Sequence, residues 1–160
     1  MIFVAADLVR SIEGAAETAY PDECCGLLVG WGDDPRHDGN VVVTRVEPSA
    51  NVAEGGTADR FEVDPRLRLR LMRELGNGPL RIVGHYHSHP DHLARPSRRD
   101  SDMAWEPDLV WVITSVKKGR AIATTAHIAD PRSGGFRELT LHVGLPPGCA
   151  AGPAAGRRHR

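Results

Sequence analysis

Two helical patterns and six short apolar runs alternate along the chain, and this alternation restricts the fold more than any other feature. Apolar residues recur at helical spacing between residues 6 and 19, and a second such segment opens at Asp64-Pro65, with proline at its favoured first position. A short helix is expected after Ser97. Turn residues bound the apolar runs, which predict strands over 25–31, 41–46, 80–86, 109–116, 121–128 and 136–142. The pattern predicts an α/β (α+β) fold in which helices flank one mixed β-sheet.

Length and charge restrict the organisation and the partners. The 160 residues suit one domain, which we place at residues 1–144, and the Pro, Gly and Ala content after it predicts a flexible tail over 145–160. Lys and Arg number 20 against 21 Asp and Glu, so the charge gives no reason to expect nucleic acid or a membrane surface as partner. No segment is long enough to cross a bilayer, and the first residues do not resemble a signal peptide. We interpret the arginines of the second helix as a solvated face; the alternative is a docking patch for an acidic partner.

The cysteines indicate a reducing compartment. There are three, of which Cys24 and Cys25 are adjacent and Cys149 lies in the predicted tail. Three cysteines do not make a disulfide framework, so we expect a cytoplasmic protein. Either adjacent thiol could act as a protease nucleophile with a histidine as base. Cysteines in buried strands are usually inert, however, and we favour a core role for both.

The strongest chemical signal is His87-Ser88-His89-Pro90 followed by Ser97 and Asp100. Side chains alternate along a strand, so His87 and His89 lie on the same side if the strand continues through them. Pro90 is expected to end the strand ladder and turn the chain, after which the loop brings Asp100 back. Two imidazoles and one carboxylate suit a zinc ion that keeps a fourth position open, and iron or manganese would also fit.

The same residues also have readings that involve no metal. Ser97 followed three residues later by Asp100 is an ordinary helix cap, which would stabilise by about 1 kcal/mol. A capped helix start is also a rigid base for a metal ligand, so the two interpretations are compatible. Four other histidines are expected to face solvent or to be hydrogen-bonded in the core: His85, His92, His127 and His142. His85 shares the side of His87 and could support the ligands from behind.

The combined motif resembles that of a known enzyme family. His-x-His-Pro, a short spacer and Ser-x-x-Asp form the signature of the JAMM metallopeptidases, the MPN-plus domain. Members commonly carry an upstream Glu-x-x-Gly-Leu-Leu, which corresponds here to Glu23-Cys24-Cys25-Gly26-Leu27-Leu28. The segment 60–65 also resembles the start of the second helix in bacterial members. The resemblance covers residues 2–142 and implies a curved sheet between helices, similar to cytidine deaminases. The Pro-Cys-x-x-Cys of those deaminases is missing, so base deamination does not fit.

The resemblance implies a role for each motif residue. His87, His89 and Asp100 match the ligands of one zinc ion per chain. Glu23 matches the general base that activates water, and Ser97 matches the hydroxyl that stabilises the oxyanion. Sequence spacing alone does not bring residue 23 to residue 87, so the role of Glu23 depends on the resemblance.

The resemblance also implies a substrate class. JAMM enzymes act beside the C-terminal Gly-Gly of ubiquitin or ubiquitin-like proteins, and the loop 89–97 resembles that of bacterial enzymes that work with sulfur carriers. We therefore expect a zinc peptidase that hydrolyses the peptide bond after the Gly-Gly of a ubiquitin-like sulfur-carrier protein, as in pathways of sulfur transfer and cysteine biosynthesis. The alternatives are an isopeptidase acting on lysine conjugates and a non-catalytic binding or scaffold module. Whether the chain acts as a monomer or a homodimer stays open.

Overall fold

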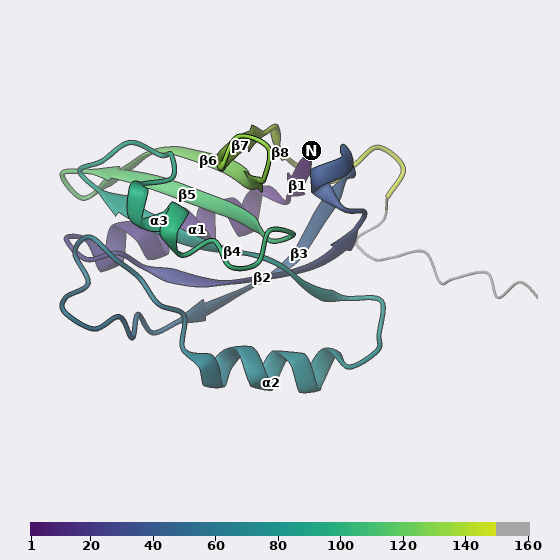
Figure 1. Ribbon diagram of the computed structural model, residues 1–160, viewed down its shortest axis with the longest axis horizontal. Helices are drawn as coiled ribbons and strands as arrows, with labels where there is room; N and C mark the ends of the chain where they lie inside the picture. The colour runs from purple at the N-terminus through teal and green to yellow at the C-terminus, as the bar shows by residue number, and fades with distance from the viewer. Residues whose placement is uncertain (150–160) are drawn as a thin grey trace, which may run out of the picture.

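One mixed sheet of eight strands organises residues 1–149, the part of the chain that the computed structural model describes (Figure 1). In chain order the elements are β1 (Ile2–Val4), α1 (Ala6–Ala19), β2 (Cys25–Gly32), the 3-10 helix η1 (Pro35–His37), β3 (Val41–Ser49), α2 (Pro65–Leu75), β4 (Arg81–Pro90), α3 (Arg98–Asp102), β5 (Val110–Lys117), β6 (Arg120–Asp130), β7 (Gly135–Leu139) and β8 (Leu141–Val143). None of these helices is long and apolar enough to cross a membrane.

The sheet is curved, and its two edge strands are joined through the chain. The strand order is β7-β6-β5-β4-β2-β3-β1-β8, so the first and last strands of this order are neighbours in the chain. Only Thr140 separates them, and its carbonyl oxygen accepts a hydrogen bond of 3.0 Å from the Ile2 N–H. β1 pairs in parallel with β3 and β8, β4 pairs in parallel with β5, and the other neighbouring strands are antiparallel.

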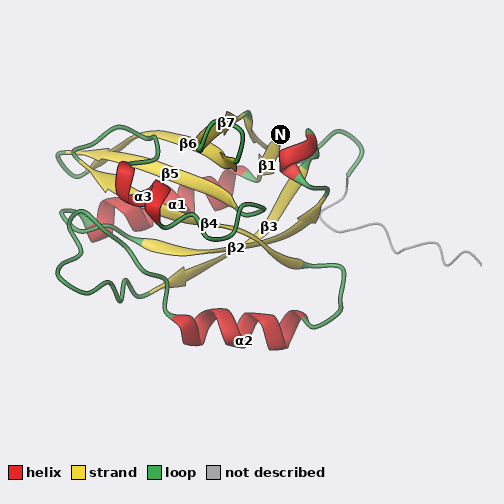
Figure 2. Cartoon of the chain, in the orientation of Figure 1, coloured by secondary structure: helices red, strands yellow, loops and turns green. Residues whose placement is uncertain are grey.

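The helices cover the two faces of the sheet (Figure 2). On one face Ile12 of α1 belongs to the larger core, which includes Leu28 of β2 and side chains of β1, β3, β4, β5 and β6. On the other face Leu71 of α2 packs in a smaller cluster with Leu27 and Val29. Alternation along β2 explains this division, because Leu28 points away from its neighbours on either side. Burial of a leucine such as Leu71 stabilises the fold by about 2 kcal/mol.

Most expected elements are confirmed, and the differences have structural reasons. α1 spans the predicted residues and ends before Pro21, and α2 begins after Asp64, whose side chain accepts from the Arg66 N–H at 2.9 Å. The prediction of a single strand over 136–142 is wrong, because Thr140 divides this segment into β7 and β8, which lie on opposite edges of the sheet. β1 and η1 were not expected, and β3 continues three residues beyond the predicted end.

Pro90 differs from its expected role. It is the last residue of β4 and still pairs with Val116 of β5, where the sequence predicted that it would stop the ladder. The chain turns one residue later at Asp91, whose φ is +56°. The strand therefore continues through both histidines of the motif, which is the condition for placing them on one side.

The pairing of β2 with β4 places the candidate site. These strands are antiparallel, with Cys25 opposite His87. Continuing this register by two residues sets Glu23, which precedes β2, opposite His89 near the end of β4. Sheet pairing thus brings together two segments that sequence spacing could not connect.

The predicted domain boundary lies close to the end of β8 at Val143, and it stays a prediction. Most of the segment expected to be a tail, residues 150–160, lies outside the described residues.

Candidate metal and catalytic site

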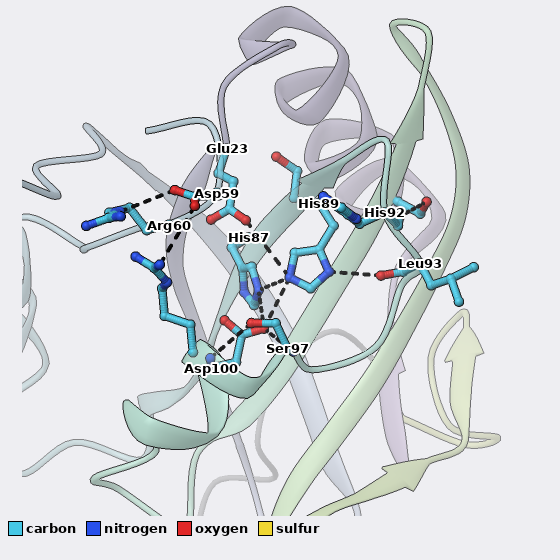
Figure 3. Close-up of polar contacts among 12 residues, drawn as sticks. Glu23, Asp59, Arg60, His87, His89, His92, Leu93, Ser97 and Asp100 are labelled. Carbon is cyan, nitrogen blue, oxygen red and sulfur yellow. Dashed lines mark hydrogen bonds and ion pairs between the residues drawn. The ribbon is translucent and has the colours of Figure 1, made fainter. Parts of the chain in front are cut away.

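Strand β4 brings two imidazoles together in the interior. His87 is fully buried and His89 is 5 % exposed, and their Nε2 atoms lie 3.0 Å apart (Figure 3). The ring of Phe61 stacks on His87 with centroids 4.2 Å apart. This packing fixes the plane of the His87 ring and keeps solvent from one of its faces.

Helix α3 supplies the carboxylate. Asp100 Oδ2 lies 3.1 Å from His89 Nε2 and 3.4 Å from His87 Nε2. The predicted helix cap is also present: Ser97 N–H donates to Asp100 Oδ2 at 2.7 Å, and Asp100 N–H donates to Ser97 Oγ at 3.1 Å. The cap and the ligand geometry therefore coexist, and the Ser97 hydroxyl hydrogen stays free for another acceptor.

The convergence of these atoms fits a metal ion. His87, His89 and Asp100 each offer a ligand atom, and all three atoms lie within 4.8 Å of one another. A tetrahedral zinc with bonds of about 2.1 Å separates its ligand atoms by about 3.4 Å. The observed separations of 3.0, 3.1 and 3.4 Å match this spacing. Two imidazoles and one carboxylate are also a donor set that suits zinc.

Burial and hydrogen bonding set the protonation of the three groups. Burial lowers the pKa of His87, which keeps that imidazole neutral. Burial also opposes charge on His89, but the hydrogen bonds to Asp100 and to the Leu93 carbonyl, together with the charges of Asp100 and Glu23, outweigh it and raise the pKa of His89. For Asp100 the hydrogen bonds from both histidines overcome burial and hold the pKa well below its usual range. A deprotonated carboxylate and a neutral imidazole are the forms that bind metals.

Glu23 lies beside the ligand cluster. Its Oε1 is 4.0 Å from His89 Nε2, and the residue is 6 % exposed (Figure 3). Its Oε2 has no hydrogen-bond partner among the described residues. Burial raises the pKa of the Glu23 carboxyl to about 8. A carboxyl group with such a pKa can both take and return a proton near neutral pH.

Two residues that sequence reasoning missed hold the backbone around Glu23. The Ser88 hydroxyl accepts from the Cys24 N–H at 2.8 Å, which ties the segment before β2 to β4. Asn51 Nδ2 donates to the carbonyl oxygens of Glu23 at 3.1 Å and of Arg60 at 2.9 Å. Asn51 Oδ1 accepts from two backbone N–H groups of the same loop, at 3.1 and 3.0 Å. A lone asparagine in a loop gives no sequence signal for this role.

The loop after β4 fixes the orientation of His89. The His89 Nδ1–H donates to the Leu93 carbonyl oxygen at 2.9 Å. This bond leaves the Nε2 lone pair of the neutral ring directed at the cluster.

Neighbouring strands hold that loop in place. The hydroxyl groups of Ser115 and Thr125 donate to the carbonyl oxygens of His92 and Ala94. His127 Nε2 lies 2.9 Å from Thr125 Oγ1. Thr125 and His127 share one side of their strand, and this alternation was the available sequence signal.

The other cysteines and histidines are placed largely as expected. Burial raises the pKa of Cys25 to about 12, and Cys24 is shifted in the same direction for the same reason. Neither thiol therefore forms a nucleophilic thiolate near neutral pH, which argues against a thiol protease. Half-buried His85 packs edge-on against Trp111 at 4.2 Å. His92 and His142 are exposed, and His127 is hydrogen-bonded.

Comparison with known proteins agrees with this fold. Residues 5–127 match the family described as prokaryotic homologs of the JAB domain. The CysO-cysteine peptidase of Mycobacterium tuberculosis (strain ATCC 25618 / H37Rv) is 31% identical over 117 residues, 73% of this chain and 75% of that protein. A desampylase of Haloferax volcanii is 35% identical over 136 residues, 85% of this chain and 88% of that protein. AF2198, a JAB1/MPN domain protein from Archaeoglobus fulgidus, shares the fold with a TM-score of 0.56 at 21% identity, covering 91% of this chain and 100% of that one.

The curved sheet with helices on both faces is the JAB/MPN fold, which confirms the predicted fold class. The chain belongs to the family of prokaryotic homologs of the JAB domain and is a JAMM-type peptidase. The predicted resemblance is confirmed. The roles assigned to the individual site residues stay predictions.

Proposed function

We propose that this chain is a zinc-dependent peptidase that hydrolyses the peptide bond after the C-terminal Gly-Gly of a ubiquitin-like sulfur-carrier protein. The observation that carries the proposal is the convergence of His87 Nε2, His89 Nε2 and Asp100 Oδ2 beside the buried Glu23 carboxyl. A zinc ion held by these three groups supplies a Lewis acid that makes water acidic near pH 7, about nine units below the pKa of bulk water.

The protein residues then divide the proton transfers and the charge stabilisation. Glu23 takes a proton from the attacking water and later gives it to the nitrogen of the leaving amine. The carboxylate form serves the first step and the protonated form the second. The Ser97 hydroxyl, whose oxygen accepts from the Asp100 N–H, keeps its hydrogen for the carbonyl oxygen as that atom gains negative charge. Loss of such a donor typically costs about 3 kcal/mol in the transition state.

The names of the relatives support the substrate class. One is a CysO-cysteine peptidase, which agrees with cleavage of a short C-terminal extension from a carrier. Two glycines before the scissile bond would pass through a narrow cleft that side chains would block. The three thiols of Cys24, Cys25 and Cys149 are free, which agrees with the cytoplasmic location that we propose.

Removal of a ubiquitin-like modifier from lysine is the second candidate, and the relative named desampylase favours it. A non-catalytic scaffold is the third, and the complete set of five site residues argues against it.

A substrate comparison separates these functions. A carrier ending in Gly-Gly followed by one further residue would be offered to the zinc-loaded protein, in parallel with the same carrier joined through its Gly-Gly to a lysine side chain. We expect faster release of the carrier from the linear extension. Faster release from lysine would instead favour the isopeptidase, and a zinc-loaded protein that cleaves neither substrate would favour the scaffold.

A further inference from the structure

The cleft around the candidate site has two parts with different linings. A cavity of about 410 Å³ is lined by Glu23, His89 and Ser97 and by the three arginines Arg95, Arg98 and Arg99. A second cavity of about 240 Å³ on the Asp100 side is lined by Arg60, Phe61 and Met103 and shares Arg99 with the first. Glu23 contributes to the first cavity and not to the second.

The position of Glu23 assigns the two parts to the two halves of the substrate. In the proposed function Glu23 protonates the leaving nitrogen, which favours the cavity that Glu23 lines as the place of the released group. The Gly-Gly tail of the carrier then lies on the other side of the ligand cluster.

The cavity for the released group carries uncompensated positive charge. Arg99 Nη2 lies 3.7 Å from Asp59 Oδ2, which also lines this cavity. Arg95 and Arg98 form no ion pair with any residue that the structure describes, and both side chains are exposed. Guanidinium groups bind carboxylates through paired hydrogen bonds in one plane.

The two candidate leaving groups differ in charge at this position. A single amino acid released from the end of a carrier has a free carboxylate one carbon from the scissile nitrogen. A lysine side chain within a conjugated protein has only methylene groups there. The free arginines therefore favour the linear extension over the lysine conjugate.

We propose that Arg95 and Arg98 bind the free α-carboxylate of one C-terminal amino acid, which makes the enzyme selective for carriers extended by a single residue. The inference rests on the proposed function and specifies its leaving group. Two other roles are open to the same arginines: solvated side chains without a ligand, and long-range attraction of an acidic carrier.

Two substrates that differ only in their last group test the inference. One is a carrier ending in Gly-Gly-Ala with a free carboxylate, and the other is the same carrier with a C-terminal carboxamide. For the wild type we expect KM for the acid to be about tenfold lower, the effect of one charge-assisted contact. The double variant Arg95→Gln/Arg98→Gln should raise KM for the acid to that of the amide and leave the amide unchanged. The control Arg70→Gln/Arg73→Gln changes two exposed arginines of α2 that do not line the cavity and should keep the full preference.

Each contrary result has a distinct meaning. If the wild type cleaves the acid and the amide equally well, Arg95 and Arg98 do not bind the carboxylate, although the proposed function stands. If the double variant weakens both substrates to the same extent, long-range attraction of the carrier replaces the inference. If the zinc-loaded wild type cleaves neither substrate, the proposed function itself fails.

Discussion

Glu23 carries its carboxyl group in an environment far from that of an exposed side chain. It is buried, its Oε2 has no hydrogen-bond partner among residues 1–149, and burial raises its pKa from 4.5 to about 8. The metal-free protein therefore holds Glu23 largely protonated at neutral pH. This makes the stability of the metal-free protein depend on pH in a definite direction.

A folded-state pKa above the unfolded value means that the folded protein binds this proton more tightly. The stabilisation from Glu23 protonation is full below about pH 4.5 and is lost as the pH rises to about 8. Glu23→Gln removes this loss, so with chelator present the variant should be more stable than wild type at pH 9, by on the order of a few kcal/mol. At pH 5 the two proteins should unfold nearly alike. Thermal unfolding at both pH values measures this, and an equal difference at pH 5 and pH 9 would contradict the assigned pKa.

At the residue scale the sequence predicted the three side chains that converge better than the groups that orient them. His87, His89 and Asp100 were predictable from the sequence because strand alternation and a helix cap are local patterns. Asn51 was not, because its partners are the backbone oxygens of Glu23 and Arg60, which only the tertiary structure brings to it.

At the scale of elements, the loop that contains Asn51 holds the backbone of Glu23. Asn51→Asp keeps the shape of the side chain but replaces the two amide donors with an oxygen facing two carbonyl oxygens. We expect kcat to fall roughly ten- to a hundredfold, because the catalytic carboxyl group is displaced. Zinc content should not change, since no ligand is moved. Exposed Asn77 after α2 offers the control Asn77→Asp, and an equal loss of kcat in both variants would remove Asn51 from this role.

The loop after β4 has a different effect, because it orients a ligand. Thr125→Val removes the hydroxyl that anchors Ala94 and should lower zinc affinity by about tenfold through His89, as loss of an orienting partner commonly does. Competition with a chelator of known affinity measures this. Thr124→Val is the matched control, because that hydroxyl contacts Glu13 of α1 at 3.2 Å and lies away from the loop. If both variants bind zinc as wild type does, the loop does not orient the ligand.

The boundaries of the helices and strands show which elements the local sequence determines and which depend on pairing with distant strands. Helices α1 and α2 were predicted closely because their periodicity, together with Pro21 after α1 and the Asp64 cap of α2, is local in the sequence. β4 was expected to stop near Tyr86 but continues to Pro90, since pairing with β5 extends it. β1 is only three residues long and depends on β3 and β8 for its hydrogen bonds, so its own sequence indicates little.

At the scale of the molecule, the fold class followed from the pattern of helices and strands, but the strand order did not. That order depends on β8 pairing with β1, which joins the last described strand to the first. The same long-range pairing principle places the site, because β2 must lie beside β4 before Glu23 meets His89. Family resemblance predicted that meeting, and strand register explains it.

The proposed mechanism requires His87, His89 and Asp100 to hold one zinc while Glu23 moves the proton. Both roles are tested by measuring the zinc content of the Glu23→Gln protein and then its turnover of a Gly-Gly-Ala-ended carrier. We predict one zinc per chain, as in wild type, with turnover lower by about 10²- to 10⁴-fold. A zinc-loaded variant that cleaves as fast as wild type would contradict the role of Glu23, and a variant that has lost its zinc would show that Glu23 belongs to the ligand set.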